Sequence, residues 1–194
     1  MTIDQDLEAR ANSGDMHAQY EMGCQWIESG RPHAVTVATW WYELAANQGH
    51  VEAATCLGVI HQRLAARHDH AAAVRWYSRA VEAGFASGQH DSYAAHCLAL
   101  AYARGLGGLA VNPVEASIWL SVAIHIAKHK KDKRRHRRMR AAVEQATMTE
   151  ASISIARGQA YGVIQALTRR GSANAGGFPS PRLGMNELVS RERE

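Results

Sequence analysis

Apolar residues recur along the chain at the spacing of an α-helix. In residues 38–45 they occupy positions i, i+3, i+4 and i+7, which lie on one side of a helix: Ala38, Trp41, Tyr42 and Ala45. The stripe returns twice, as Ala73, Trp76, Tyr77, Ala80 and as Ala116, Trp119, Leu120, Ala123. A shorter stripe precedes each of these, with alanine four residues before methionine or leucine: Ala18 and Met22, Ala53 and Leu57, Ala94 and Leu98. The pattern predicts an all-α fold of antiparallel helix pairs.

The helix pairs form an internal repeat. Several positions recur 35 residues apart, and a third copy follows at offsets of 41 and 43. One helix pair cannot bury its stripe alone, whereas stacked pairs bury it against their neighbours. We therefore expect an α/α solenoid in residues 1–127, with three repeats at about 12–48, 49–83 and 84–127. The repeat-defining residues are Ala38, Trp41, Ala45, Gly49, Ala53, Gly58, Ala73, Trp76, Ala80, Gly84, Ala116, Trp119 and Ala123.

Proline and glycine mark where the helices begin and end. Pro32 and Pro113 suit the first turn of a helix, and Gly49 and Gly84 suit the left-handed residue that follows one. Small alanines let the helices approach closely. We expect the tryptophan of each stripe to fill the space between neighbouring pairs.

The repeated residues resemble the Sel-1-like repeat family, which is related to the tetratricopeptide repeats. That family places A-x-x-W-Y-x-x-A on one helix and G-x-x-x-A-x-x-x-L-G on the other. GHVEAATCLG (49–58), ATWWYELAANQG (38–49) and AVRWYSRAVEAG (73–84) match it, and the similarity covers about residues 12–127. In the third copy Leu120 replaces tyrosine and Ala99 replaces glycine. The resemblance implies a right-handed superhelix that acts as a non-enzymatic adaptor or scaffold for a protein or peptide.

The repeat pattern fades after residue 127. Residues 128–170 are expected to form a capping helix pair, with a capping box at Thr147–Glu150 and a helix end at Gly171. One face of the second helix is apolar: Ile153, Ala156, Ala160, Ile164 and Leu167. Residues 171–194 show no periodicity, and we expect a disordered tail there.

The basic charge of the chain is concentrated in one segment. The net charge is +4, but residues 128–140 contain nine Lys or Arg and only one acid, so the remainder of the chain is acidic. The candidate anion-binding residues on this helix are Lys130, Lys131, Arg134, Arg135, Arg137 and Arg138. Such a helix suits three roles: a solvated cap, a contact with an acidic protein surface, or a contact with nucleic-acid phosphates. An anionic membrane is a fourth partner for it. No aromatic residue interrupts the segment, which argues against sequence-specific reading of bases.

The residues that carry catalysis or bind metals do not form a recognisable motif. No GxSxG elbow is present, Gly105–Gly108 lacks the lysine of a phosphate loop, and His125 and His129 have no acid between them. His68, Asp69 and His70 are the other candidate metal ligands. The three cysteines are widely spaced, so we expect buried thiols rather than disulfides: Cys24, Cys56 and Cys97. We therefore expect no enzymatic activity, cofactor or metal.

The expected function is protein binding, with nucleic-acid binding through residues 128–140 as the alternative. The candidate protein contacts are polar residues off the buried stripe: Glu43, Gln48, Arg75 and Arg79. No apolar stretch approaches the ~20 residues of a membrane span, and the acidic start lacks a signal-peptide pattern. We expect a cytoplasmic protein, although export without such a signal stays open.

Overall fold

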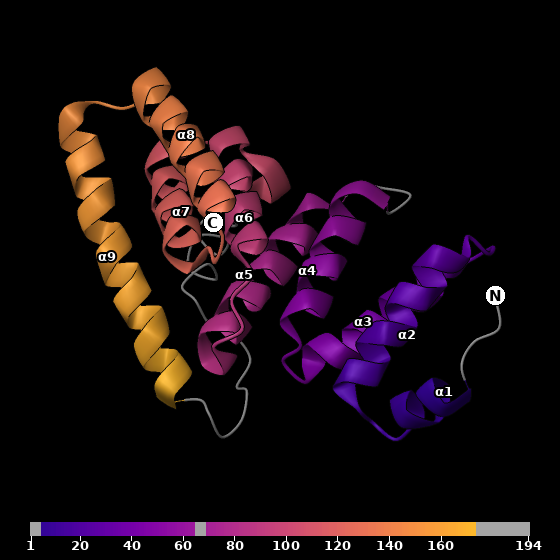
Figure 1. The fold of residues 1–194 in the computed structure, drawn as a ribbon. Helices are drawn as coiled ribbons and strands as arrows, with labels where there is room; N and C mark the ends of the chain where they lie inside the picture. Colours follow the sequence, from indigo (N-terminus) through magenta and orange to yellow (C-terminus); the bar gives the residue numbers. More distant parts are fainter. Residues whose placement is uncertain (1–4, 65–68, 174–194) are drawn as a thin grey trace, which may run out of the picture.

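The computed structural model describes residues 5–64 and 69–173, and every regular element within them is helical (Figure 1). In chain order the elements are α1 (Gln5–Asn12), α2 (Met16–Ser29), α3 (Ala34–Asn47), α4 (Val51–Val59), the π-helix η1 (Ile60–Leu64), α5 (His70–Ser87), α6 (Ser92–Arg104), the 3-10 helix η2 (Leu106–Gly108), α7 (Pro113–Ile126), α8 (Lys130–Thr147) and α9 (Glu150–Ala173). No helix in these ranges has both the length and the apolar character needed to cross a membrane.

The helices pack in consecutive pairs that stack into a solenoid. Helix α2 packs on α3, α4 on α5 and α6 on α7, and the pairs join through α3 with α4 and α5 with α6 (Figure 1). Helix α1 covers the N-terminal end by packing on α2, whereas α8 and α9 pack on α7 at the other end. The all-α solenoid predicted from the repeated stripes is therefore confirmed.

Small residues form the closest contacts between the helices. The alanines of the predicted stripes are almost completely buried: Ala18, Ala38, Ala45, Ala53, Ala73, Ala80, Ala94, Ala116 and Ala123. Because alanine has only a methyl group, neighbouring backbones approach closely at these positions. The small residues thus set the spacing of the stack.

The large residue that fills each pair is not the tryptophan. Trp41 is buried, whereas Trp76 and Trp119 are half-buried and pack against the core. The expected role of tryptophan between neighbouring pairs stays a prediction. The following residue of the stripe is buried every time: Tyr42, Tyr77 and Leu120. These residues face the partner helix of their own pair, where the available space depends on a single glycine or alanine.

Each buried tyrosine lies against a glycine. A Cβ atom added to Gly23 would lie 2.6 Å from Cδ1 of Tyr42, and one added to Gly58 would lie 2.6 Å from Cδ1 of Tyr77. Carbon atoms in contact are normally about 3.5–4.0 Å apart, so neither position has room for a side chain. In the third pair the same two positions carry Ala99 and Leu120, both fully buried. The two departures of this copy are therefore a matched change, in which a larger residue faces a smaller one.

Two of the four proline and glycine residues predicted to mark helix ends do so, namely Pro113 and Gly49. Pro113 is the first residue of α7, and the side chain of Asn112 before it accepts a hydrogen bond from the Glu115 N–H. Gly49 follows α3 with a φ of 97°, which is the expected left-handed conformation. Pro32, by contrast, lies before α3, which begins at Ala34.

Gly84 does not end a helix, contrary to expectation. Helix α5 continues to Ser87, and Gly88 takes the left-handed conformation with a φ of 74°. Gly84 is buried inside the helix, where an added Cβ would lie 3.2 Å from the Gln89 carbonyl oxygen and 3.3 Å from the Cα of His90. The close return of the chain after α5 therefore leaves little room for a side chain at this position.

Helix α9 also differs from its predicted ends. Thr147 is the last residue of α8, and it is Thr149 whose side chain accepts the Ser152 N–H at the start of α9. The helix runs past Gly171 to Ala173, and Gly171 packs against the backbone of Phe85. Of its predicted apolar face, Ala156, Ala160 and Leu167 are buried whereas Ile153 and Ile164 are half-buried. The rest of the predicted tail, residues 174–194, lies outside the described residues.

Candidate functional site

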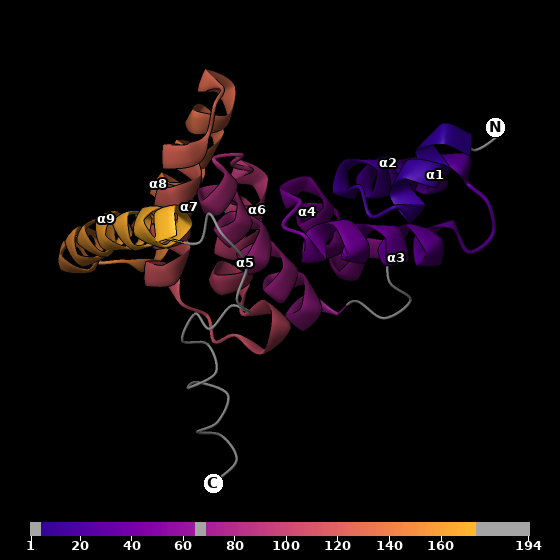
Figure 2. The ribbon, with the colours of Figure 1, turned by 90° about the horizontal axis from the view of Figure 1, so that it is seen from below.

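Helices α2, α4, α6 and α8 form one layer of the molecule. Figure 2 shows α8 at one end and α1 with α2 at the other, both extending beyond α4 and α6 toward the same side. The surface of this layer is therefore concave, and we call it the inner face. Helices α3, α5 and α7 form the outer layer.

A stripe of accessible residues runs along each inner helix. On α4 and η1 the stripe is Glu52, Cys56, Val59 and Arg63, which are half-buried or exposed. The equivalent residues 41 positions later are Tyr93, Cys97, Leu100 and Arg104, of which only Cys97 is buried. Those 35 positions earlier are His17, Glu21, Cys24 and Glu28. The repeat thus places the same four positions on the inner face from three successive helices.

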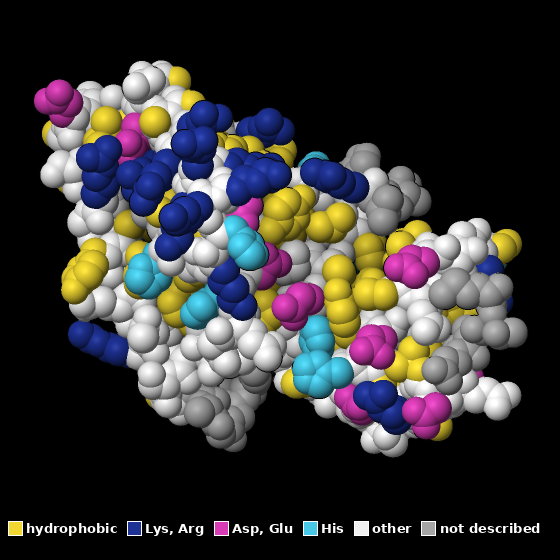
Figure 3. Space-filling view, viewed as in Figure 1, with side chains coloured by type: hydrophobic (Ala, Val, Ile, Leu, Met, Phe, Trp, Pro, Cys, Tyr) yellow, Lys and Arg dark blue, Asp and Glu magenta, His cyan; other side chains and the backbone are white. Residues whose placement is uncertain are grey.

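The charge of these stripes changes along the solenoid. The α2 stripe carries two carboxylates, the α4 stripe one acid and one arginine, and the α6 stripe one arginine and no acid. Helix α8 then adds its basic residues. Figure 3 shows Lys and Arg gathered over α8, acids mainly toward α1, α2 and α4, and hydrophobic side chains between them. The inner face is therefore acidic at its N-terminal end and basic at its C-terminal end.

The structure brings the predicted anion-binding residues together on the exposed surface of α8. All six are exposed: Lys130, Lys131, Arg134, Arg135, Arg137 and Arg138. The other side of the helix packs on the repeats through His136 and Glu144, which are both buried. The basic segment is thus one border of the inner face, and its orientation depends on these two polar contacts.

The first contact is a buried histidine pair between α6 and α8. The Nδ1 atoms of His96 and His136 lie 3.2 Å apart, and each ring is at most 4% exposed. Burial, together with the neighbouring His136 and Arg135, lowers the pKa of His96 to about 4. Burial also lowers the pKa of His136. At neutral pH both rings are therefore uncharged, and one Nδ1–H donates to the other Nδ1.

The second contact is an ionic clamp around Glu144. Its carboxylate accepts hydrogen bonds from the Ser117 hydroxyl of α7 at 2.7 Å and from the Arg157 guanidinium of α9 at 2.9 Å. The Arg140 side chain lies 3.7 Å from the same carboxylate. Burial alone would raise the pKa of Glu144, but these partners lower it. One acid thus holds α7, α8 and α9 together.

Two of the three cysteine thiols on the inner face have a raised pKa. The Tyr42 hydroxyl donates to Cys24 Sγ at 3.4 Å, and all three cysteines are free. Burial raises the pKa of Cys56 to about 11 and also raises that of Cys97, so both thiols stay protonated at neutral pH. Cys24 and Cys56 are half-buried rather than buried as expected.

The candidate metal ligands that the structure describes form no metal-binding cluster. Within the described residues, no three His, Cys, Asp or Glu side chains come together in a way that could hold a metal ion. Asp69 accepts the Ala72 N–H and caps α5 instead. His68 lies outside the described residues.

The four predicted protein-binding residues belong to the outer layer. Glu43 and Gln48 lie on α3 and at its end, and Arg75 and Arg79 lie on α5. Gln48 donates a hydrogen bond to the Gln19 side chain at 2.7 Å, and Arg79 donates to the Asn47 side chain at 2.8 Å. Glu43 is half-buried and Arg75 is exposed. These four residues stay a prediction, distinct from the inner face.

The inner stripe lies on the helices without the repeated tryptophan stripe, whereas the predicted contacts lie on the tryptophan helices or at their ends. A sequence signal for the inner stripe is present: Cys56 and Arg63 recur 41 positions later as Cys97 and Arg104. These recurring positions lie off the buried stripe, so the helical period places them on a separate helix face. The contact of α6 with α8 depends on the tertiary structure.

Comparisons with known proteins agree with this architecture. A family model described as "Sel1 repeat" matches residues 17–50, 52–85 and 92–124, more than half of the chain. The crystal structure of a Sel1 repeat protein from Oxalobacter formigenes is similar, with a TM-score of 0.55 and 28% identity, covering 68% of this chain and 95% of that one. No curated protein sequence matches the chain. The three matched repeats show that the chain belongs to the Sel1 repeat family.

Proposed function

We propose that this protein is a non-catalytic adaptor or scaffold that binds a protein or peptide on its inner face. Sel1 repeats are generally protein–protein interaction modules. The observation that carries the proposal is the stripe of four positions that recurs on α2, α4 and α6. Most of its residues are accessible, although the helices around them are tightly packed. Concave surfaces of helical solenoids present such residues as extended binding sites.

The composition of the stripe also favours binding over catalysis. On α4 and α6 its centre carries apolar side chains, Val59 and Leu100, while its ends carry charged or aromatic ones. Such a surface provides apolar contact in the middle and polar specificity at the rim, as protein interfaces do. The protonated thiols of Cys56 and Cys97 are poor nucleophiles.

Site-specific photo-crosslinking tests this proposal. A photoreactive residue is placed at Val59 or Leu100 on the inner face, at Arg75 on the outer layer, or at the exposed Gln159 of α9 as control. Each protein is irradiated in nuclease-treated lysate of the cell that encodes it. We expect a discrete protein adduct from the two inner positions. Adducts confined to Arg75 would move the site to the outer layer, and equal adducts at all positions would refute a specific site.

A further inference from the structure

We propose that the inner face selects a polypeptide segment rich in acidic residues, seated across Arg63, Tyr93 and Arg135. The inference rests on the proposed function and adds the chemistry of the partner. These residues come from η1, α6 and α8, so the site forms only where the cap meets the second and third repeats.

A chain of ring contacts links Tyr93 to His136, the neighbour of Arg135 in α8. The Tyr93 ring stacks on His96 with centroids 6.2 Å apart, and His96 meets His136 of α8 with centroids 5.1 Å apart. Arg135 precedes His136 and is exposed. The buried histidine pair therefore positions a cationic side chain at the edge of the third repeat.

Arg63 approaches the same tyrosine from the second repeat. Burial and Cys97 raise the pKa of Tyr93, whereas Arg63 and Arg135 act in the opposite direction. Arg63 ends the stripe of α4 and η1, Tyr93 begins the stripe of α6, and α4 contacts α6, so the two residues border the same part of the inner face. Arg63 and Arg135 are 72 positions apart in the chain. Two cations and a phenol that converge in this way match the acceptors of a carboxylate-rich segment.

These two arginines have no acidic partner among the described residues. Arg10, Arg140 and Arg157 each form a salt bridge within the chain, whereas neither Arg63 nor Arg135 does. Both guanidinium groups are exposed, so an incoming carboxylate can pair with them without displacing an acid of the described residues.

The surroundings favour a polypeptide over a nucleic acid. Toward α8 the basic surface continues through Lys131 and Arg134, but toward the N-terminal end the inner face carries Glu21, Glu28 and Glu52. A long polyanion would meet these carboxylates, whereas a peptide can place acids on the basic end and neutral or basic residues on the acidic end. The α8 segment also has no aromatic side chain on which bases would stack.

The middle of the inner face suits an apolar side chain of the same peptide. Val59 of α4 and Leu100 of α6 are half-buried and lie at the equivalent position of successive repeats. Figure 3 shows hydrophobic side chains between the acidic and basic ends of this face. The expected partner therefore combines acids with apolar residues.

Fluorescence anisotropy with the full chain tests the inference. The probe is a labelled synthetic peptide of alternating Glu and Leu, compared with a Gln and Leu peptide and with a single-stranded oligonucleotide of similar length. We expect the acidic peptide to bind about tenfold more tightly than either comparison probe. Its affinity should fall as salt increases because mobile ions screen the exposed charges.

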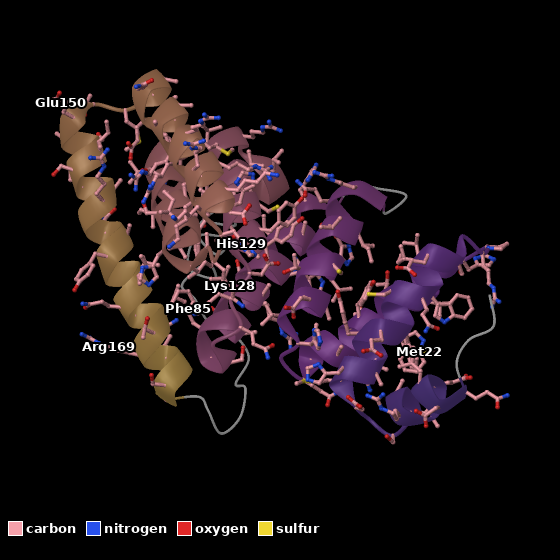
Figure 4. All side chains as sticks on the ribbon, viewed as in Figure 1. Met22, Phe85, Lys128, His129, Glu150 and Arg169 are labelled. Atoms are coloured by element: carbon pink, nitrogen blue, oxygen red, sulfur yellow. The ribbon has the colours of Figure 1, made fainter. Side chains whose placement is uncertain are left out.

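Charge reversal locates the binding site. Arg63→Glu and Arg135→Glu should each weaken the acidic peptide about tenfold, which corresponds to ~1.4 kcal/mol. Arg169→Glu is the matched control, because this exposed arginine lies near the far end of α9, away from α4 and α6 (Figure 4). Arg63→Lys and Arg135→Lys should retain most of the affinity. Circular dichroism confirms that each variant is folded.

Several results would overturn the inference. Equal binding of the uncharged peptide, equal loss in Arg169→Glu, or tighter binding of the oligonucleotide would each do so. Self-association abolished by Arg63→Glu, without peptide binding, would identify a second copy as the occupant instead. If the crosslinked partner persists in the Arg63→Glu/Arg135→Glu protein, the inference fails while the proposed function stands. If Val59 and Leu100 give no adduct in the chain that keeps both arginines, the inference and the proposed function are both refuted.

Discussion

Replacement of Gly58 by alanine should destabilise the protein, although alanine is normally the better helix former. The reason is the ring of Tyr77, which lies against Gly58 on the partner helix of the same repeat. An added Cβ would lie 2.6 Å from Cδ1 and 2.8 Å from Cζ of that ring. Carbon contacts are normally about 3.5–4.0 Å long, so the ring would have to shift by about 1 Å. Tyr77 is only 2% exposed, so other buried residues surround the ring and oppose such a shift.

The expected loss of stability in Gly58→Ala follows from a comparison with a second glycine that also lies within a helix. Overpacking a core typically costs about 1–3 kcal/mol, whereas glycine to alanine in an unobstructed helix gains about 1 kcal/mol. At the exposed Gly158 of α9 an added Cβ meets nothing within 4 Å, so Gly158→Ala should show only the gain. The difference between the two variants therefore isolates the clash. We expect it to be about 2–3 kcal/mol.

The third repeat indicates how the clash is relieved. There the equivalent pair is Ala99 and Leu120, so Tyr77→Leu should make room for Gly58→Ala. Tyr77→Leu alone should cost about 2–3 kcal/mol, because it removes buried volume and the hydrogen bond from the Tyr77 hydroxyl to Gln62 at 2.8 Å. The double variant should be at least about 1 kcal/mol more stable than the sum of the single effects.

Urea unfolding followed by helical circular dichroism measures all four proteins. The slope with urea should stay constant if only the folded state changes. Two results would show that the contact between Gly58 and Tyr77 does not explain the paired change to Ala99 and Leu120. One is a double variant whose stability equals the sum of the single effects within about 0.5 kcal/mol. The other is a Gly58→Ala protein as stable as Gly158→Ala.

Three further predictions concern the C-terminal cap. Burial lowers the folded-state pKa of His96 to about 4 and also lowers that of His136, so the unfolded chain binds more protons below about pH 6.5. The free energy of unfolding should therefore fall by up to about 3 kcal/mol as the pH drops from about 7 toward 4. In urea titrations, His96→Asn should make this dependence on pH less steep. Glu144→Gln should lower stability by about 2–3 kcal/mol because it removes the charged acceptor shared by α7, α8 and α9, seen as a lower thermal midpoint. Gly171→Ala should loosen the end of α9 because its Cβ would lie 2.6 Å from the carbonyl carbon of Phe85, seen as faster proteolysis near that end.

Each of these predictions has a control on the same part of the molecule. His129→Asn replaces an exposed histidine at the start of α8 and is the matched control for the removal of a histidine. Glu150→Gln changes an exposed acid of α9 and should shift the midpoint little. Gly162→Ala adds a methyl group where nothing lies within 4 Å, so it should not increase proteolysis. Controls that behave like the variants they accompany would contradict the assigned contacts.

The difference between Gly49 and Gly84 shows where sequence reasoning reached its limit. Both glycines occupy the same repeat position, and both were expected to end a helix. Gly49 does so, but Gly84 lies inside α5, and the chain after α5 folds back against it. The sequence shows that glycine recurs at this position of the repeat. It does not record whether the requirement comes from a left-handed conformation or from a close contact.

The sequence by itself determined the helix pairs, their stacking into a solenoid and the basic character of α8. These features follow from local periodicity and from charge along one helix, both of which can be read without tertiary information. Only the tertiary structure decided that Tyr77 is buried more fully than Trp76 in its pair, and that His96 of α6 meets His136 of α8. The physical reason is that helical spacing identifies which residues share a face, whereas the angle and depth at which helices pack decide which faces meet.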